Sequence, residues 1–241
     1  MISDSLLDSL ATAISKKTQL PEFPAGISVA DAYPCLPILT QKVSGSSAGI
    51  KAGITNVDLQ KLFGLEEALI GLLYQNGEIR SGSNLPYSPH RRIECEMAVT
   101  FDAHGNPIAV GPAMEFVSLD FARPEDMTPG NVTLCNLGAD QFICGDMRDW
   151  DSFDFHALSV LEIVATRDGE TLLTTTPMDS LGGPRSAHAW CMAKANELGY
   201  SLPQGGILLA GTNGSALPGE PGEYKIHFGH LGSIQFTIEG A

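Results

Sequence analysis

The chain has 241 residues and a formal net charge of −14, because 28 Asp and Glu stand against 14 Lys and Arg. This negative field repels phosphate backbones, so the charge argues against a nucleic-acid partner. No apolar run approaches the roughly 20 residues that a membrane-spanning helix needs, so no membrane association is expected. The five cysteines are scattered and form no Cys-x-x-Cys pair, which argues against a disulfide framework or a thiolate zinc site and favours a reducing cytoplasm.

Residues 1–48 are predicted to form a small helical region. Its first helix, over residues 1–17, is indicated by apolar side chains at helical spacing. These side chains are Ile2, Leu6, Leu10 and Ile14. The segment has neither a basic head nor a long apolar stretch, so it is not expected to be a secretory signal.

A short second helix is expected after Ser28, which is a candidate N-cap for Val29–Ala32. Pro34 and Pro37 are expected to interrupt this helix early. The reason is that proline lacks the N–H donor that an inner helical turn needs.

Residues 49–241 are predicted to form a β-rich domain that makes one structural unit with the helical region. Its first apolar segment is Ile50–Thr55, and Asp58–Leu73 combines a helix with an apolar end. The clearest strand is Ile93–Phe101, whose alternation has the period of a half-buried strand. Shorter strands are expected at Ile108–Val110, Met114–Leu119, Asn131–Leu134, Phe142–Cys144, Ser159–Arg167, Glu170–Thr175, Ile207–Ala210, Tyr224–Phe228 and Ser233–Ile238.

One hairpin turn and the two ends of one later helix are clearly indicated by the sequence. Asp168-Gly169 indicates a hairpin turn between two strands. Pro184 in the first turn and Gly199 just past the end frame a helix with Ala187–Leu198 as its body. The expected fold class is therefore α+β.

Glu94 and Glu96 are the most informative pair of residues. On a strand, residues two apart project to the same face, so both carboxylates point the same way. Two neighbouring carboxylates repel, and a divalent cation such as Mg²⁺ or Mn²⁺ would neutralise them. The alternative is a solvent-facing strand with two exposed glutamates.

Glu115 and Lys51 are single charges within apolar or small-residue stretches. A buried glutamate is costly unless it is paired or bound to a metal, although Glu115 would also be tolerated on the wet face of an edge strand. Lys51 is flanked by small residues, and a lysine in such surroundings can serve as an acid or base. The alternative for Lys51 is an amine that reaches solvent.

Several segments, in this order, resemble the fumarylacetoacetate hydrolase superfamily, most closely its branch of 2-keto-4-pentenoate hydratases and 4-oxalocrotonate decarboxylases. The matching segments are Asp31–Tyr33, Gly49–Thr55, Arg92–Glu96, Gly111–Glu115, Asn136–Gly145, Leu209–Thr212 and Leu231–Ser233. The resemblance implies the superfamily's mixed β-roll, a homo-oligomer and a cytoplasmic enzyme, with a paired pathway enzyme as a further possible partner.

Carried over position by position, the resemblance makes the three glutamates ligands of Mg²⁺ or Mn²⁺ and Lys51 the general acid/base. It places Asn136 and Thr212 in the pocket of a small 2-oxo acid substrate. A 2-oxo acid offers a carboxylate oxygen and a keto oxygen to one octahedral cation, which stabilises enolate charge.

The implied function is a metal-dependent lyase, a hydratase of a small unsaturated 2-oxo or 2-hydroxydienoic acid. The alternatives are decarboxylation of a vinylogous 2-oxo acid and carbon–carbon hydrolysis of an acylpyruvate. An alternative of another class is a non-catalytic metal-binding homologue or partner subunit. Gln75 and Asn76 favour that last alternative, because the family has an acidic residue there, unless Glu78 substitutes.

Overall fold

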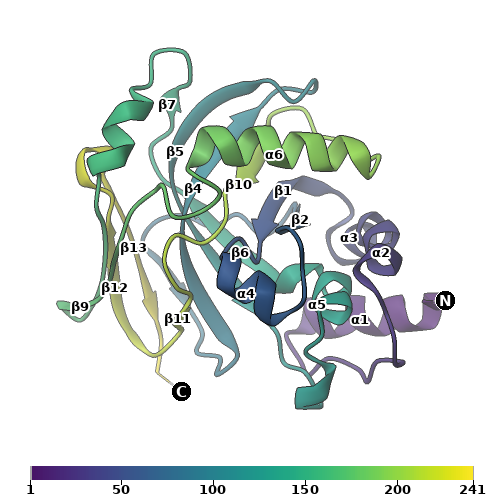
Figure 1. Cartoon of the computed structure of the whole chain (residues 1–241). Helices are drawn as coiled ribbons and strands as arrows, with labels where there is room; N and C mark the ends of the chain where they lie inside the picture. The colour runs from purple at the N-terminus through teal and green to yellow at the C-terminus, as the bar shows by residue number, and fades with distance from the viewer. Residues whose placement is uncertain (1, 241) are drawn as a thin grey trace.

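The computed structural model describes residues 2–240, which form two β-sheets with helices packed around them (Figure 1). The larger sheet has the strand order β2-β1-β10-β4-β5-β6, with β11 beside β4 and β7 beside β5. Its strands are β1 Ser47–Gly53, β2 Leu69–Tyr74, β4 Arg91–Phe101, β5 Pro107–Ser118, β6 Ala139–Cys144, β7 Arg148–Asp149, β10 Gly206–Leu209 and β11 Leu217–Pro218. The expected α+β class is confirmed.

The smaller sheet has the strand order β3-β13-β12-β8-β9. Its strands are β3 Ser83–Leu85, β8 Ile163–Arg167, β9 Glu170–Thr175, β12 Gly222–His227 and β13 Ser233–Ile238. The α-helices are α1 Asp4–Lys16, α2 Val29–Ala32, α3 Leu36–Ser44, α4 Val57–Leu62, α5 Pro129–Leu134 and α6 Pro184–Glu197. Among the described residues, no helix has the length and apolar character to cross a membrane.

The larger sheet curls so strongly that its two edges meet. Phe142 lies in β6, at one edge, and its N–H donates to the Gly77 carbonyl at 2.9 Å. The Phe142 carbonyl accepts from the Ile79 N–H, also at 2.9 Å. Gly77 and Ile79 follow β2, the strand at the other edge. The sheet thus has an inner and an outer face, as the expected β-roll requires.

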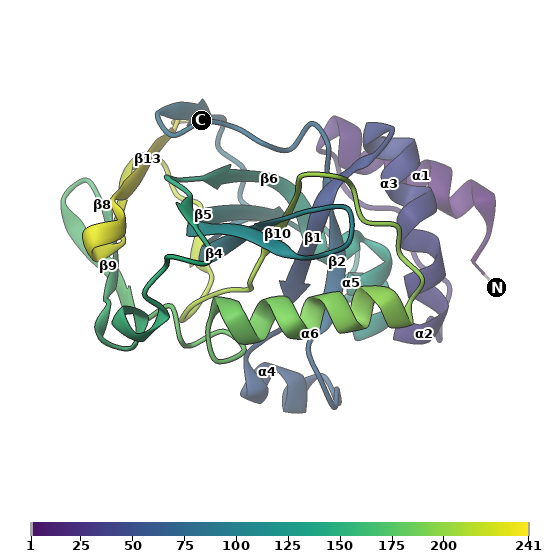
Figure 2. The same ribbon diagram turned by 90° about the horizontal axis from the view of Figure 1, so that it is seen from above.

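The outer face is covered by the smaller sheet and by α6, which runs along one side of the larger sheet (Figure 2). Phe116 of β5 packs edge-to-face on Phe236 of β13, with ring centroids 4.9 Å apart. The buried residues of α6, such as Cys191, share one hydrophobic cluster with Met97 and Val99 of β4. Odd-numbered β4 residues therefore face outward, and the even-numbered ones face into the curl.

The N-terminal helices form a second layer against one end of the roll. Leu7 and Leu10 of α1 pack with Leu39 of α3 and Leu134 of α5 in a cluster of their own. The Ser28 side chain caps α2 by accepting from the Asp31 N–H, as its sequence position predicts.

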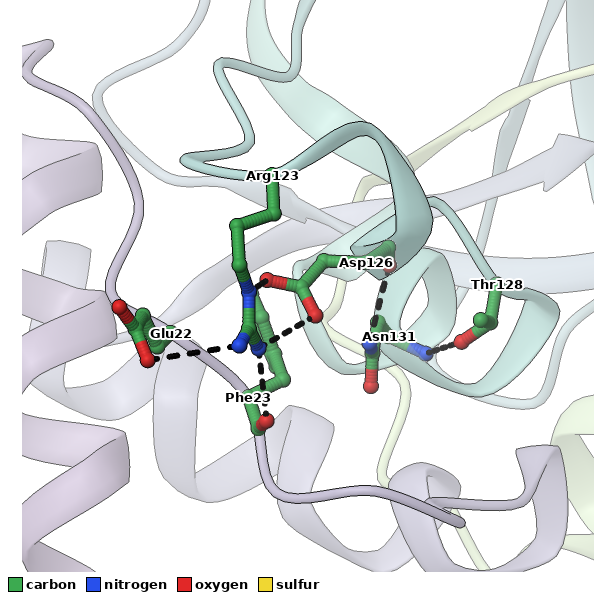
Figure 3. A network of polar contacts seen from close by, with 6 residues as sticks. All are labelled: Glu22, Phe23, Arg123, Asp126, Thr128 and Asn131. Atoms are coloured by element: carbon green, nitrogen blue, oxygen red, sulfur yellow. Dashed lines mark hydrogen bonds and ion pairs between the residues drawn. The ribbon is translucent and has the colours of Figure 1, made fainter.

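Arg123 ties the segment after α1 to the loop before α5 (Figure 3). Its guanidinium donates to both carboxylate oxygens of Asp126, at 3.0 and 2.9 Å, and to the Phe23 carbonyl at 3.3 Å. It also forms an ion pair with Glu22 at 3.5 Å. Asn131 completes the network by donating its side-chain amide to the Asp126 carbonyl at 2.9 Å.

Two strand predictions are wrong. Residues 131–134 belong to helix α5 and not to a strand, because Thr128 supplies an N-cap and Pro129 stands in the first turn. Ser159–Arg167 is a strand only from Ile163, because Phe155–Val160 forms a 3₁₀-helix.

The two strands expected around Gly111-Pro112 are one continuous strand, β5. The Pro112 carbonyl accepts from the Gly145 N–H at 2.8 Å, where the outer neighbour of β5 changes from β7 to β6. Backbone N and C=O of one residue point to the same side of an antiparallel strand. The Pro112 nitrogen therefore faces the side on which β7 gives way to β6. Its missing N–H does not remove a hydrogen bond to β4.

Helix α3 is an element that the sequence did not predict. Pro34 and Pro37 lie in the first turns of the 3₁₀-helix Tyr33–Cys35 and of α3. A proline there removes only an N–H that has no helical partner, so the prolines begin new helical segments after α2.

Candidate metal centre and active site

Three glutamates converge on the inner face of the curl. Glu94 and Glu96 are even-numbered residues of β4, and Glu115 of β5 is the direct cross-strand partner of Glu94. One ligand oxygen from each lies within 4.8 Å of the others. The structure therefore brings together the three carboxylates that the sequence singled out.

Lys51 reaches the same cluster from the other side of the roll. Its strand, β1, is separated from β5 by β10 and β4 in the sheet, but the curl brings the side chains together. Lys51 Nζ lies 2.5 Å from Glu115 Oε1 and donates to the Leu137 carbonyl at 3.4 Å.

Burial decides between the alternatives that the sequence left open. Glu96 and Glu115 are 0% and 1% exposed, and Lys51 is 1% exposed, while Glu94 is partly exposed. Neither Glu96 nor Glu115 is a solvated strand residue, and Lys51 does not reach solvent. The sequence did not reveal this burial because strand periodicity is the same for a wet face and for the inside of a roll.

The pKa values reflect this burial and crowding. Burial raises the pKa of the Glu115 carboxyl to about 7, although the Lys51 ammonium acts to lower it. Burial, and then the charges of Glu115 and Glu94, raise the pKa of Glu96 well above its ordinary value. Burial acts to lower the pKa of Lys51, but the three carboxylates outweigh it, and the pKa is raised.

The cluster fits a divalent cation. Glu96 Oε1 and Glu115 Oε2 are buried and have no hydrogen-bond partner among the described residues. When all three carboxyls are ionised, they and the Lys51 ammonium leave a net charge of −2 in a largely buried place, which is costly without compensation. An all-oxygen ligand set suits Mg²⁺ or Mn²⁺.

The segment after β10 runs along β4 and completes the cluster. The Gly211 N–H donates to Glu96 Oε2 at 2.7 Å, and the Asn213 N–H donates to the Cys95 carbonyl at 2.8 Å. Thr212 lies between them and is partly exposed. Gly211 has φ 94°, and a Cβ there would lie 2.5 Å from the Ser180 hydroxyl. The close approach of this backbone therefore requires glycine.

Sequence reasoning missed Gly211 and Asn213. The Gly211 contact is made by a backbone N–H, which leaves no trace in residue type. Asn213 follows the predicted Thr212 directly, but nothing in the local pattern marks it as buried.

Asn136 lies close to Lys51, but both polar atoms of its carboxamide are hydrogen-bonded to backbone groups. Its Oδ1 accepts from the Leu72 N–H at 2.8 Å, and its Nδ2 donates to the Leu72 carbonyl at 2.7 Å. The amide thus extends the edge of β2. Asn136 and Leu137 have φ of 55° and 54°, and this turn brings the Leu137 carbonyl to Lys51. The substrate-contact role of Asn136 stays a prediction.

The amides that replace the expected acid, Gln75 and Asn76, are exposed in the turn after β2. Glu78, the suggested substitute, is exposed and pairs its backbone with Phe142. The carboxylates whose charges raise the pKa of Lys51 are those of the cluster itself. Glu115 is therefore the acidic partner that the structure gives Lys51.

Known proteins resemble the chain over most of its length. A 2-keto-4-pentenoate hydratase from Paraburkholderia xenovorans (strain LB400) is 24% identical over 234 residues, covering 88% of this chain and 85% of its own. A 4-oxalocrotonate decarboxylase from Pseudomonas sp is 24% identical over 206 residues, covering 80% of this chain and 78% of its own. No family model matches the chain.

The solved structure of 4-oxalocrotonate decarboxylase from Pseudomonas putida G7, complexed with magnesium and adipate, has a TM-score of 0.84 against this chain. It is 22% identical in sequence, and the match covers 99% of both chains. The relatives support the resemblance to the fumarylacetoacetate hydrolase superfamily, and to its branch of 2-keto-4-pentenoate hydratases and 4-oxalocrotonate decarboxylases, that is seen in the sequence. The solved structure shows that the fold is shared over the whole chain.

Proposed function

We propose that the chain is a divalent-cation-dependent hydratase of a small unsaturated 2-oxo acid. The observation that carries this proposal is the buried cluster of Glu94, Glu96 and Glu115 with Lys51 at 2.5 Å from Glu115. The sequence similarity to a 2-keto-4-pentenoate hydratase supports the reaction class.

The three glutamates would hold Mg²⁺ or Mn²⁺, in keeping with the magnesium present in the structurally similar decarboxylase. When bound, such an ion supplies Lewis-acid stabilisation of negative charge on a substrate oxygen. The Gly211 N–H holds one oxygen of Glu96, and this bond fixes the direction in which the other oxygen, Oε1, is presented.

Lys51 would move the proton. Because its pKa is raised, Nζ carries a proton at neutral pH and can deliver it to a substrate carbon. Delivery to the far end of a 2-hydroxydienoic acid gives a conjugated 2-oxo acid, which then adds water across its double bond. Positioned proton transfer of this kind supplies about 10²–10⁴-fold in rate. Burial of Lys51 limits competing exchange with bulk water.

A decarboxylase of a vinylogous 2-oxo acid is the second candidate. It is favoured by the similarity to a 4-oxalocrotonate decarboxylase in sequence and by the fold match over the whole length of another. The same Nζ proton would then be delivered to the carbon from which carbon dioxide departs.

The test is turnover of 2-hydroxydienoic and 2-oxo acids in the presence of Mg²⁺ or Mn²⁺, followed by ultraviolet absorbance and by carbon dioxide release. Cation-dependent loss of dienol absorbance without carbon dioxide is the expected result. Carbon dioxide release would assign the decarboxylase, and release of pyruvate from an acylpyruvate would assign the hydrolase. No turnover of any substrate, with cation still bound, would indicate a non-catalytic homologue.

A further inference from the structure

The amine of Lys51 is held from two sides. Nζ lies 2.5 Å from Glu115 Oε1 and donates to the Leu137 carbonyl at 3.4 Å. An ammonium group has three N–H donors, so holding two of them fixes the direction of the third. Glu115 is also a proposed cation ligand, whereas the Leu137 carbonyl is a neutral backbone group. The Leu137 carbonyl is therefore the holding group that is not shared with a bound cation.

The Leu137 carbonyl lies in an uncommon backbone turn. Asn136 and Leu137 have φ of 55° and 54°, in the left-handed region. Asparagine enters this region more readily than most residues, but leucine rarely does. Two consecutive residues keep this conformation only where neighbouring groups hold them. The groups that hold the turn therefore also decide where the Leu137 carbonyl lies.

The Asn136 side chain holds the turn to strand β2. Its Oδ1 accepts from the Leu72 N–H at 2.8 Å, and its Nδ2 donates to the Leu72 carbonyl at 2.7 Å. Asn136 is 0% exposed, so water does not compete for these bonds. Leu72 follows Gly71, which is the direct cross-strand partner of Lys51. The two bonds therefore fix the turn relative to the strand that lies beside Lys51.

Gly71 shows how closely these groups fit together. A Cβ at this position would lie 3.1 Å from Asn136 Oδ1, 3.1 Å from Lys51 Cγ and 3.3 Å from Leu137 Cδ1. The amide, the lysine stem and the leucine side chain thus meet over one glycine. Because protein interiors are closely packed, a displaced amide would leave space into which the lysine stem could move.

We propose that Asn136 is a positioning residue: its carboxamide holds the turn to β2, so that the Leu137 carbonyl fixes the Lys51 ammonium for proton delivery. This inference rests on the proposed function. It differs from the substrate contact that the family resemblance implies, because both polar atoms of the amide are already bonded to Leu72.

The experiment measures kcat and KM for 2-hydroxypenta-2,4-dienoic acid at saturating Mn²⁺, together with Mn²⁺ affinity by calorimetry. Asn136→Gly removes both side-chain bonds and keeps a residue that adopts the left-handed turn freely. Because misplacement of a reacting group by about 1 Å can cost about 100-fold in rate, we expect kcat to fall by about 10- to 100-fold. KM and Mn²⁺ affinity are expected to stay within about twofold of wild type, since the glutamates keep their places.

A double-mutant cycle shows whether the effect runs through Lys51. If Asn136 acts by placing the amine, Asn136→Gly should lower turnover little further once Lys51→Met has removed that amine. A general loosening of the fold would instead lower turnover by the same factor in both backgrounds.

Gly71→Ala tests the same arrangement without removing a polar group. The added methyl group would crowd Asn136 Oδ1 and Lys51 Cγ, so kcat is expected to fall while KM and Mn²⁺ affinity are kept. Gly145→Ala is the matched control, because a Cβ there would lie 3.3 Å from the Pro112 Cβ, outside the carboxylate cluster. If Asn136→Gly does not fold, Gly71→Ala decides the question alone.

Asn131 provides the matched control for the loss of a buried amide. Its Nδ2 donates to the Asp126 carbonyl at 2.9 Å, within the Arg123 network (Figure 3). Asn131→Gly is expected to lower the midpoint of thermal unfolding about as much as Asn136→Gly and to leave kcat unchanged.

Wild-type kcat in both Asn136→Gly and Gly71→Ala would overturn the positioning role. A raised KM with unchanged kcat in Asn136→Gly would overturn it in favour of substrate contact, and loss of Mn²⁺ binding would overturn it in favour of support for the cation site. Equal loss of turnover in Asn131→Gly, or an equal factor in the Lys51→Met background, would show general destabilisation instead. A wild-type protein that turns over neither a 2-hydroxydienoic acid nor a vinylogous 2-oxo acid would overturn both this inference and the proposed function.

Discussion

Two strands, β10 and β4, lie between the strand of Lys51, β1, and the strand of Glu115, β5, and yet Lys51 Nζ and Glu115 Oε1 are 2.5 Å apart. In a flat sheet, neighbouring strands are about 4.8 Å apart. Three such spacings would separate β1 from β5 and would keep the Lys51 amine from contacting the Glu115 carboxylate. Curling of the larger sheet removes that distance. It also encloses both side chains, and burial is what makes their charges strong partners.

Glu96→Gln should abolish cation binding without harming the fold. Burial and neighbouring carboxylates raise the Glu96 pKa well above its usual value, so the cation-free fold favours the neutral form of this carboxyl, which glutamine imitates. The loss in Mn²⁺ affinity should exceed the about 10–100-fold that loss of an outer-shell partner costs.

Calorimetry with Mn²⁺ and thermal unfolding of the cation-free protein check this prediction. Glu78→Gln is the control, since Glu78 is an exposed glutamate outside the cluster. Equal Mn²⁺ affinity in Glu96→Gln and the wild type would show that the cation binds elsewhere.

Lys51→Met should separate chemistry from cation binding. Turnover should fall by about 10²–10⁴-fold because the proton carrier is gone. Mn²⁺ should bind at least as tightly, because the cluster loses its ammonium. The cation-free protein should lose about 3–5 kcal/mol of stability at alkaline pH, where Glu115 is left as an unpaired buried charge.

The matched control for Lys51 is Lys17→Met, which removes an exposed lysine that is paired with Asp140. That change should alter stability by less than about 1 kcal/mol. Wild-type turnover in Lys51→Met would exclude the amine from the reaction.

Local patterns in the sequence were sufficient for the carboxylate pair and for several elements. The alternation of β4 placed Glu94 and Glu96 on one face, and the Asp168-Gly169 turn has the expected left-handed backbone at both residues. Helix α6 also begins at the predicted Pro184 and ends before Gly199. In each case the signal lies within a few residues of the feature.

Features that depend on distant contacts did not follow from the sequence. Whether Glu96 and Glu115 are wet or buried depends on the curl, which is closed by bonds between residues 77–79 and Phe142. The contact between Lys51 and Glu115 depends on the same closure. Helix α5 forms where the sequence pattern predicts a strand, because Thr128 caps it and Pro129 stands in its first turn.

Cation affinity should rise with pH through neutrality. Glu115 must lose its proton to act as a ligand, and its pKa of about 7 places that loss between pH 6 and pH 8. For one proton, apparent Mn²⁺ affinity should increase about tenfold from pH 6 to pH 8. Calorimetry at a series of pH values measures this, and Glu115→Gln should remove the pH dependence together with most of the binding.

The stability of the cation-free protein should change in the opposite direction. A carboxyl whose pKa is raised on folding contributes stability that is complete below its ordinary pKa of 4.5 and is lost as pH rises through about 7. The midpoint of thermal unfolding without cation should therefore fall between pH 5 and pH 8 by more than in Glu115→Gln. Parallel pH profiles of the two proteins would show that Glu115 is not titrating in this window.

Bound cation should raise the midpoint of thermal unfolding. Comparison with Glu96→Gln distinguishes binding at the carboxylate cluster from general screening of surface charge. At a concentration 100 times Kd, a ligand of the native state adds about 2.7 kcal/mol, which is about 5–11 °C for a chain of this size. The whole chain carries a net charge of −14, so any divalent salt also relieves repulsion among its surface charges. Glu96→Gln keeps nearly all of that surface charge and lacks the site. A rise in the wild type that Glu96→Gln does not share therefore comes from the carboxylate cluster, whereas equal rises would assign the effect to the surface.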